Sequence, residues 1–310
     1  MKIQLSILAA SISLAAAGMA HAEGPIDGKV YGKVNVTLQS SDEAGNDSRV
    51  TEIVSNASRL GFKGKTGLND DLNVIYKLEY EASVDDGDKS GQTFTQRNSY
   101  VGLEGGFGKV IAGIHDTPTK LSQNKVDLFN DYEGDIKNVF SGENRMKNTL
   151  MYSTPDMNGL AADFAFIASE DENQDDAYSL AVKFSQDSIY AALAYDMDVE
   201  GEETSNLRLV TKLSIDDLTL GLMWNKFEND AADFDEDGFL ISAAYKMGSN
   251  TFKIQHAASE IKAEGGEQTS IGMDHKLAKN TKVFGFYTME DEDAADSDSN
   301  WIAVGIEHKF

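Results

Sequence analysis

The feature that most constrains this fold is a two-residue alternation of apolar and polar side chains that recurs along nearly the whole chain. In the stretch LNVIYKLEYE, at positions 72–81, every second residue is apolar: Leu72, Val74, Tyr76, Leu78 and Tyr80. Successive side chains of a β-strand point to opposite faces, so this period predicts strands with one apolar and one polar face. The open question is whether the apolar face meets a protein core or a lipid.

Segments of this kind follow one another from residue 25 to the C-terminus. We expect 16 strands, at 25–40, 51–66, 71–84, 92–104, 108–116, 145–155, 160–170, 176–185, 187–198, 203–214, 217–229, 235–247, 250–261, 266–277, 281–291 and 299–310. Only three prolines occur in the whole chain, so few residues would interrupt the hydrogen-bonded ladder.

The connections between these segments are of two alternating kinds. Short connections such as GLNDD (67–71), GGFG (105–108) and MGSN (247–250) have good turn chemistry. Longer connections such as SEDENQDDA (169–177) and MEDEDAADSDS (289–299) are strongly acidic. Short turns on one rim and long loops on the other, joined by strands of about 10 residues, are typical of outer-membrane barrels.

The charged face of the strands decides between a soluble sandwich and a barrel with a wet interior. A packed core would have to bury Arg59, Lys63, Lys77 and Glu79, and each unpaired charge would cost several kcal/mol. A ring of about 16 strands instead leaves an aqueous channel, and its closure removes exposed sheet edges. We therefore predict an all-β fold, a 16-stranded antiparallel transmembrane β-barrel with lipid outside and water inside.

The first 22 residues, MKIQLSILAASISLAAAGMAHA, have the pattern of a cleaved secretory signal peptide. One lysine precedes a short apolar run, which ends in the A-x-A pattern of Ala20 to Ala22. A retained membrane helix is the alternative, but the run is short and interrupted by serine. Residues 23–310 would then form a single barrel, because no later segment approaches the roughly 18 consecutive apolar residues of a spanning helix.

Composition argues against several classes of function. The formal net charge is −25, the wrong sign for a nucleic-acid binder, so we expect no nucleic-acid partner. Cysteine is absent, and the histidines of the mature chain lack metal-ligand spacing: His115, His256, His275 and His308. No G-x-S-x-G elbow occurs either. We expect no metal, no cofactor and no enzymatic activity.

The acidic stretch DFDEDG at 233–238 is similar to the first half of a calcium-binding loop. Position 12 of that loop requires a bidentate glutamate, and the residue there is Ala244. We expect a solvated acidic loop instead, with at most weak divalent-ion bridging to anionic lipopolysaccharide.

Four stretches in chain order resemble the Gram-negative general diffusion porins, and together the resemblance covers essentially the whole mature chain. They are SRLGFKGKTGLNDDL, RNSYVGLEGGFGKVIAGIHDTP, NRMKNTLMYSTPDMNGL and the C-terminal WIAVGIEHKF. The third resembles the branch with an R-x-K-N-S-x-x-Y-x-S-P pattern. The resemblance implies a homotrimeric passive channel for small hydrophilic solutes in the Gram-negative outer membrane. It also implies a C-terminal signal for the outer-membrane assembly machinery, here Ile302, Val304, Ile306 and Phe310.

The resemblance further implies that a long third loop folds into the lumen and narrows it. The matching segment, DTPTKLSQNKVDLFNDYEGDIKNVFSGEN at about 116–144, contains enough apolar residues to argue against disorder. In the family, acids on this loop face basic residues of the barrel wall. By motif position or strand parity, the expected wall residues are Arg59, Lys63, Lys77, Glu79, Arg97 and Arg145. The candidate loop acids are Asp127, Asp131, Glu133 and Asp135.

Two departures from the family pattern affect the expected ion selectivity. Ile114 and Met151 stand where many relatives carry a basic residue, so the constriction should be less positive than usual. The overall acidity of the chain adds to a cation preference, because a cleft of one sign concentrates counter-ions. Alternatively, the wall arginines are rim or interface charges that pair with neighbouring acids.

Two other functions remain open at this point. A substrate-specific channel would carry a line of exposed aromatic residues through the lumen, whereas the inward face offers few beyond Tyr31. A non-conducting surface barrel, an adhesin or an enzyme, would carry no ion current in a lipid bilayer.

Overall fold

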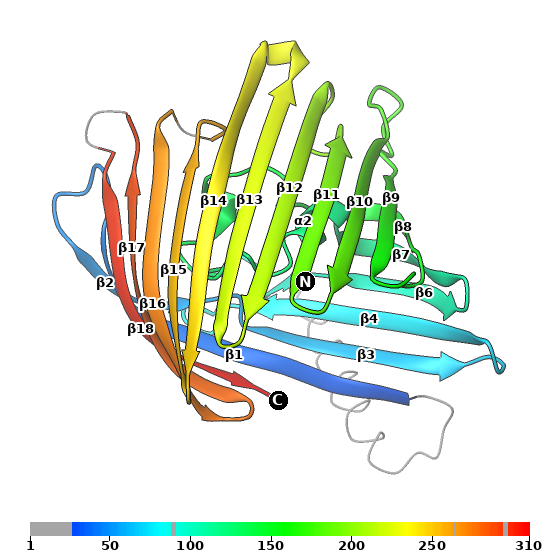
Figure 1. Cartoon of the computed structure of the whole chain (residues 1–310), viewed down its shortest axis with the longest axis horizontal. Helices are drawn as coiled ribbons and strands as arrows, with labels where there is room; N and C mark the ends of the chain where they lie inside the picture. Colours follow the sequence, from blue (N-terminus) through cyan, green and yellow to red (C-terminus); the bar gives the residue numbers. More distant parts are fainter. Residues whose placement is uncertain (1–26, 88–90, 263, 294–296) are drawn as a thin grey trace, which may run out of the picture.

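The computed structural model describes residues 27–87, 91–262, 264–293 and 297–310, which form one antiparallel sheet. The predicted signal peptide, residues 1–22, lies outside the described residues. The helical segments are α2 (Pro118–Ser122), η1 (Ile136–Asn138) and η2 (Asp230–Ala232). The strands, shown in Figure 1, are β1 (Asp27–Asp42), β2 (Val50–Ser55), β3 (Arg59–Gly67), β4 (Leu72–Ala82), β5 (Phe94–Gln96), β6 (Ser99–Gly105), β7 (Gly108–Asp116), β8 (Arg145–Ser153), β9 (Leu160–Ile167), β10 (Ala177–Gln186), β11 (Ile189–Met197), β12 (Thr204–Ile215), β13 (Leu218–Asn229), β14 (Phe234–Met247), β15 (Asn250–Ser259), β16 (Gly266–Ala278), β17 (Thr281–Asp291) and β18 (Ser299–Lys309).

The sheet closes into a ring where β1 pairs with β18, in a register that runs from Lys33 opposite Lys309 to Asp42 opposite Asn300. Gly32 extends this contact: its N–H donates to the carbonyl of Phe310 at 3.0 Å, and its own carbonyl accepts from the Phe310 N–H at 3.1 Å. A Cβ atom at position 32 would lie only 2.6 Å from the carbonyl oxygen of Arg59, so this close approach of three strands requires glycine.

Two of the predicted strands are interrupted, so the strand segments occupy 16 places in the ring. β2 and β3 both pair with β1, and β5 and β6 both pair with β4. At the first break, Ala57 has a φ of +47°, and the Ser58 hydroxyl bonds both to the backbone N–H and to the carbonyl of Asn35. The prediction of a 16-stranded antiparallel barrel is confirmed. The expected continuity of 51–66 and 92–104 was wrong, because local side-chain hydrogen bonds replace the ladder at the first break.

The two faces of the strands are divided as the alternation predicts. On β1, Val34 and Leu38 are exposed on the outer face, whereas Asn35, Thr37 and Gln39 point inward and are buried. On β18, the outward Ile302, Val304 and Ile306 are 54%, 61% and 44% exposed, and the terminal Phe310 is 57% exposed. An apolar surface that continues around the ring is far larger than a protein tolerates in water, and it fits a barrel in lipid. Among the described residues, no helix is both long and apolar enough to cross a membrane.

The rims of the barrel also differ. The connections at 216–217, 248–249 and 279–280 are two-residue turns, whereas those at 168–176 and 260–265 are longer. Figure 1 shows the short turns of β12–β13 and β14–β15 at the same rim as the C-terminus. In bacterial barrels the short turns face the periplasm and the long loops face outward.

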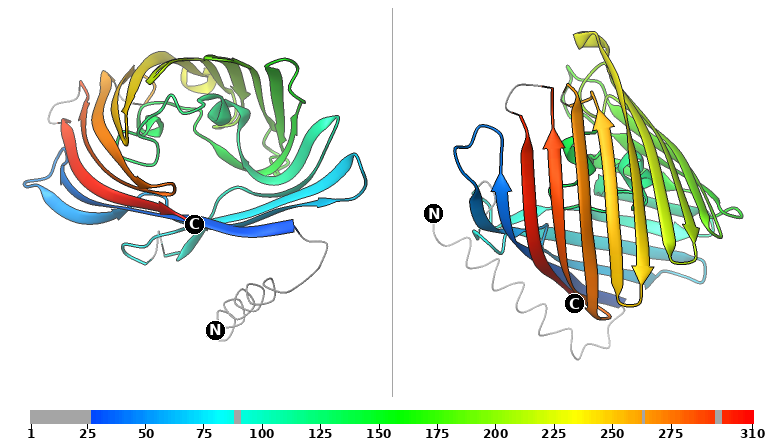
Figure 2. Two further views of the ribbon diagram at one scale, coloured as in Figure 1. Left: turned by 60° about the horizontal axis from the view of Figure 1, so that its bottom comes forward. Right: turned by 60° about the vertical axis from the view of Figure 1, so that its left-hand side comes forward.

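The segment between β7 and β8 packs against the inward side of the strands and lies within the ring in Figure 2. Its apolar side chains are buried together with those of β11–β15, in a cluster that includes Val126, Ile136, Phe140, Met223 and Leu240. Polar side chains of the wall hold its backbone. The Ser242 hydroxyl donates to the Val126 carbonyl at 2.6 Å, and the Gln255 amide donates to the Gly134 carbonyl at 2.9 Å. This long connection is therefore ordered by the wall it covers.

Candidate pore constriction

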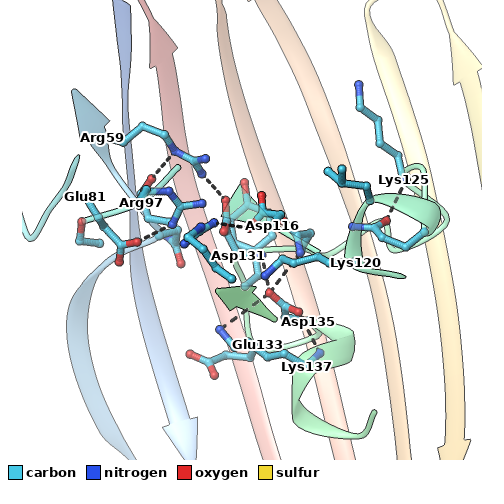
Figure 3. A pocket seen from close by; sticks show the side chains of 18 of the residues that line it. Arg59, Glu81, Arg97, Asp116, Lys120, Lys125, Asp131, Glu133, Asp135 and Lys137 are labelled. Carbon is cyan, nitrogen blue, oxygen red and sulfur yellow. Dashed lines mark hydrogen bonds and ion pairs between the residues drawn. The ribbon is translucent and has the colours of Figure 1, made fainter. Parts of the chain in front are cut away.

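A cavity of about 620 Å³ lies between the wall of β2–β8 and the segment 117–144 (Figure 3). We call it the constriction cavity. Charged groups from both sides line it, among them Arg59, Glu81, Arg97, Asp116, Asp131 and Arg145. The structure thus brings together the three predicted wall arginines and places a loop carboxylate opposite them.

The first wall arginine reaches the loop directly. Arg59 stands at the start of β3, with its side chain on the inward face, and its Nη2 lies 2.7 Å from Oδ2 of Asp131. Lys33, inward on the neighbouring β1, places its Nζ 2.9 Å from the same oxygen. Lys33 is not among the wall residues predicted from the sequence. The alternation along β1 predicts that Lys33 faces inward. Its pairing with Asp131 cannot be predicted from that alternation, because Asp131 lies far away in the sequence.

The second wall arginine is held by carboxylates of its own wall. Arg97 Nη1 lies 2.6 Å from Oε2 of Glu81, and its Nε lies 3.3 Å from Oε1 of Glu79. Glu79 also meets Nζ of Lys77 at 3.2 Å and accepts a hydrogen bond from the Tyr31 hydroxyl at 2.8 Å. Glu79 is therefore the centre of a charge network on β4.

The third wall arginine closes the same side of the cavity. Arg145 Nη2 lies 2.9 Å from Oδ1 of Asp116, and its Nε donates to Oδ1 of Asn98 at 2.9 Å. The Asn98 amide in turn donates to Asp116 Oδ2 at 2.8 Å. This arginine is fixed in position by a carboxylate and an amide that are themselves hydrogen-bonded.

Three predicted wall residues lie beside the cavity rather than in its lining. Lys77 and Glu79 face inward next to it, within the network of Arg97. Lys63 lies further toward the short-turn rim, with its Nζ 4.8 Å from the centre of the Tyr31 ring. Strand parity thus predicted the correct face for all three, but not their height along the barrel.

The four candidate loop acids have different surroundings. Asp131 faces the wall, and although burial opposes ionisation, the charges of Lys33 and Arg59 hold its pKa below its usual range. Glu133 also lines the cavity, where its Oε1 accepts from the Gln39 amide at 2.8 Å. These two carboxylates therefore present negative charge to the passage.

The other two acids, Asp127 and Asp135, stabilise the fold of the loop by accepting hydrogen bonds from its backbone. Asp127 accepts hydrogen bonds from the backbone N–H groups of Phe129 at 3.0 Å and Ile136 at 3.4 Å, and it does not line the cavity. Burial, followed by the nearby Asp135 carboxylate, raises the pKa of Asp127 well above its usual range. Asp135 does line the cavity, but its carboxylate also accepts from the N–H groups of Asp131 and Lys137, both at 2.9 Å.

Met151 lies in an apolar patch on the inner wall. It is buried with Ile75, Ile111 and Ala165. The inner wall at this position is therefore apolar.

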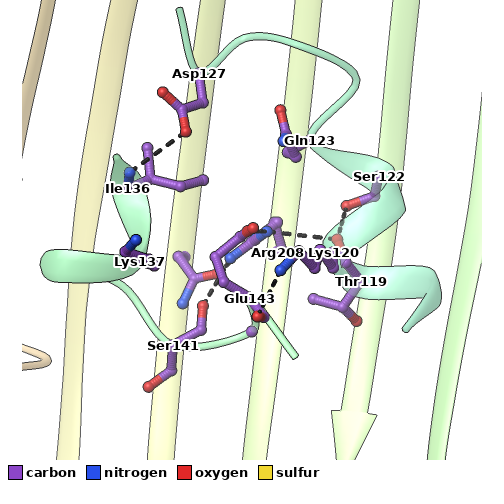
Figure 4. Close-up of polar contacts among 12 residues, drawn as sticks. Thr119, Lys120, Ser122, Gln123, Asp127, Ile136, Lys137, Ser141, Glu143 and Arg208 are labelled. Atoms are coloured by element: carbon purple, nitrogen blue, oxygen red, sulfur yellow. Dashed lines mark hydrogen bonds and ion pairs between the residues drawn. The ribbon is translucent and has the colours of Figure 1, made fainter. Parts of the chain in front are cut away.

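The base of the loop is fastened to the opposite wall by Arg208 of β12, which is fully buried (Figure 4). Its Nη1 lies 2.6 Å from Oε1 of Glu143, and its Nη2 donates to the Ser141 carbonyl at 2.6 Å. A longer bond of 3.4 Å runs from Nη1 to the Thr119 carbonyl in α2. The Arg208 side chain thus holds both ends of the segment 117–144. Arg208 is not among the residues predicted from the sequence.

Comparison with known proteins identifies the family to which this barrel belongs. A family model described as Gram-negative porin matches residues 8–305, so the chain belongs to the Gram-negative porin family. The outer membrane porin protein 32 of Delftia acidovorans is 29% identical over 314 residues, which cover 90% of this chain and 87% of that protein. The solved anion-selective porin from Comamonas acidovorans superposes with a TM-score of 0.79 at 23% identity, covering 92% of this chain and 100% of that one. A trimer form of OmpT from Vibrio cholerae gives 0.69 at 16% identity, covering 93% and 100%.

The resemblance noted in the sequence is therefore confirmed, and the protein is an outer-membrane channel for passive diffusion, not an enzyme. Within the described residues, no group of three or more histidine, aspartate or glutamate side chains is placed to hold a metal ion. The acidic 233–238 stretch enters strand β14 instead of forming a calcium loop.

Proposed function

We propose that the constriction cavity is the narrowest part of a water-filled passage for small hydrophilic solutes, which it selects by size and charge. The observation that carries this proposal is the position of Asp131, whose carboxylate meets Lys33 and Arg59 across the cavity. Opposed charges on two sides of a narrow lumen make a transverse field, as in other charged-ring pores. Solutes that carry their own dipole or charge must align with that field to pass.

We further propose a modest cation preference. Arg59, Arg97 and Arg145 each pair with a carboxylate, so the wall arginines add little net positive charge to the passage. The long-loop rim, in contrast, carries acidic stretches such as 170–176 and 198–203, which concentrate cations at the entrance. Salt screens this field beyond about 8 Å at physiological ionic strength, so the preference should be small. The solved porin from Comamonas acidovorans, which is 23% identical to this chain, is anion-selective, so the reversal potential decides between the two preferences.

The first prediction concerns the reversal potential of the channel across a potassium chloride gradient in a planar bilayer. We expect a potential of the sign that marks cation preference, because the entrance is acidic and the constriction is nearly neutral. The measurement also tests the channel itself. A clear anion preference would discard the selectivity proposal, and an absence of current would favour a non-conducting barrel.

The second prediction concerns the two arginines that are paired within the wall. Arg97→Ala or Arg145→Ala should raise the cation-to-anion permeability ratio about two-fold, because one positive charge near the lumen is lost while the neighbouring carboxylates stay. Glu79 retains Tyr31 and Lys77 as partners, so the barrel should still fold. The ratio is read from reversal potentials, and folding from circular dichroism in detergent.

A matched control for these variants is Arg49→Ala. Arg49 is an arginine of the long-loop rim, 40% exposed in its pair with Asp42 and absent from the cavity lining. The substitution removes the same charge from a place outside the passage, so the cation-to-anion permeability ratio of this variant should stay near that of the unaltered protein. If both wall variants behave like this control, they do not line the pore.

We also propose that the protein assembles as a homotrimer in contact with lipid and lipopolysaccharide. The trimer form of OmpT, which shares this fold, supports the assembly. Ile302, Val304, Ile306 and Phe310 lie exposed on the outer face near the C-terminus, where the assembly machinery could read them as a signal. Divalent cations between the acidic loops and lipopolysaccharide would complete the contact with the outer leaflet.

A substrate-specific channel is the second candidate. The inward face carries more aromatic residues than the sequence reading expected, since Tyr190, Phe284 and Phe286 all point inward. Each is only 6% exposed, however, because the segment 117–144 packs over them. They anchor the loop rather than line the passage, so a general channel is the better proposal.

A further inference from the structure

A second cavity, of about 230 Å³, lies at the short-turn end of the inner wall, on β15–β18. We call it the short-turn pocket. Four lysines line it: Lys276, Lys279, Lys282 and Lys309. In a chain with a formal net charge of −25, such a concentration of ammonium groups in one pocket needs an explanation.

The two carboxylates of the pocket are already occupied. Asp274 meets Nζ of Lys282 at 2.9 Å with one oxygen and Nζ of Lys253 at 3.2 Å with the other. Glu307 likewise meets Nζ of Lys309 at 3.0 Å. Each carboxylate therefore pairs with two lysines, since the other oxygen of Glu307 lies 3.8 Å from Nζ of Lys33.

The remaining two lysines have no such compensation. In the part of the chain that the structure describes, neither Lys276 nor Lys279 has a carboxylate within ion-pair distance. Both are exposed to the pocket, beside the hydroxyl-bearing Thr251 and Thr281. The Thr281 hydroxyl already bonds to Nδ1 of His308 at 2.8 Å, which leaves Thr251 as the neutral donor. Two ammonium groups with a hydroxyl nearby suit a small oxyanion, whose charge-assisted hydrogen bonds are among the stronger ones in proteins.

Lys33 lies between the short-turn pocket and the constriction and contacts a residue of each. Lys33 binds Asp131 of the loop at 2.9 Å and lies 3.8 Å from Oε2 of Glu307, a residue that lines the pocket. The pocket therefore lies on the short-turn side of the constriction. The short turns of bacterial barrels face the periplasm, so the pocket lies at the periplasmic mouth.

We propose that the short-turn pocket binds a small dianion, of the class of inorganic phosphate, at the periplasmic mouth of the channel. This inference rests on the proposed channel function. Acidic loops at one end and an ammonium pair at the other give the passage charges of opposite sign along its axis. The bound anion would be held near the exit on the side of Lys276 and Lys279.

The test uses single-channel recording of the purified full-length protein in potassium chloride, with inorganic phosphate added to one side at a time. The chain has no cysteine, so Ala231→Cys on the long-loop rim, together with a bulky impermeant thiol reagent, reports which way a channel has inserted. We expect phosphate on the short-turn side to reduce the current at lower concentration than phosphate on the long-loop side. The double variant Lys276→Ala with Lys279→Ala should raise the half-blocking concentration about ten-fold or more, because two unit charges leave the pocket.

The matched control is Lys246→Ala. This lysine lies one residue before the end of β14, near the same rim and with the same inward parity, but it does not line the pocket. The substitution removes one positive charge from the periplasmic mouth, and the half-blocking phosphate concentration should stay close to that of the unaltered protein. The proposal would be overturned if phosphate blocked the current at the same concentration from both sides. It would also be overturned if the control raised the half-blocking concentration as much as the double variant does.

A second measurement separates failure of the site from failure of the channel. Broadening of the phosphorus-31 resonance of inorganic phosphate by the detergent-solubilised protein reports binding without requiring conduction. Broadening that disappears in the double variant supports the site even if the channel does not conduct. Conducting channels that neither broaden the resonance nor respond to phosphate would refute the site and leave the channel function intact.

Discussion

Replacing Arg208 with leucine should destabilise the barrel by about 3–5 kcal/mol, because the change leaves the carboxylate of Glu143 buried without its partner. Glu143 is only 4% exposed in this pair. Three further hydrogen bonds to Asn225, Ser141 and Thr119 disappear with the guanidinium. A urea titration of the folded protein in lipid vesicles, followed by circular dichroism, measures the loss.

The same substitution should change conduction, because Arg208 ties both ends of the segment 117–144 to the wall of β12. Without it, the loop can leave its position over the lumen, and single-channel records should show noisier current with a larger mean conductance. A quiet channel of unchanged conductance would mean that the other wall contacts, such as those of Ser242 and Gln255, suffice to hold the loop.

A double variant separates the buried charge from the lost packing. In Arg208→Leu with Glu143→Leu no charge is left unpaired, and buried ion pairs can often be replaced by apolar residues at little cost. We expect the double variant to recover at least about 2 kcal/mol of the stability lost by Arg208→Leu alone. If the double variant is as unstable as the single one, the orphaned carboxylate is not the cause.

The strand positions could be predicted because the barrel has two solvents. Lipid outside and water inside impose the same two-residue period on every strand, and β17 (Thr281–Asp291) begins and ends where that period predicts. The same period placed Arg59, Lys77 and Glu79 on the inward face. The breaks in the second and fourth strands could not be predicted, since the first depends on the Ser58 hydroxyl meeting the backbone of Asn35 on another strand.

The loop partners could not be predicted from strand parity, because the loop has no fixed period. Asp127 and Asp131 are four residues apart in the same acidic segment, yet one is buried under the loop and the other faces the wall. Asp131 has a φ of +71°, a left-handed conformation that turns the chain there. Lys33 and Arg208 are inward by parity, but their partners lie 98 and 65 residues away, and only the folded chain brings them together.

Asp131→Asn should produce the largest change in ion selectivity, because this loop carboxylate pairs with both Lys33 and Arg59 across the constriction cavity. Asparagine keeps the size of the side chain while it removes the charge. A unit charge contributes about 1 kcal/mol at 4 Å in water, a factor of about 5 in local ion concentration, and more where the lumen is narrow. We therefore expect the cation-to-anion permeability ratio to fall about five- to ten-fold, with anions favoured in the variant.

The matched control for this change is Asp127→Asn, four residues away on the same loop. Its carboxylate lies outside the cavity and already resists ionisation, since burial raises its pKa. The same chemical change should therefore leave the reversal potential almost unaltered, although the hydrogen bonds to Phe129 and Ile136 are weakened. Similar shifts in both variants would show that selectivity responds to the general charge of the loop. A shift confined to Asp131→Asn would identify the acid that faces the wall arginines.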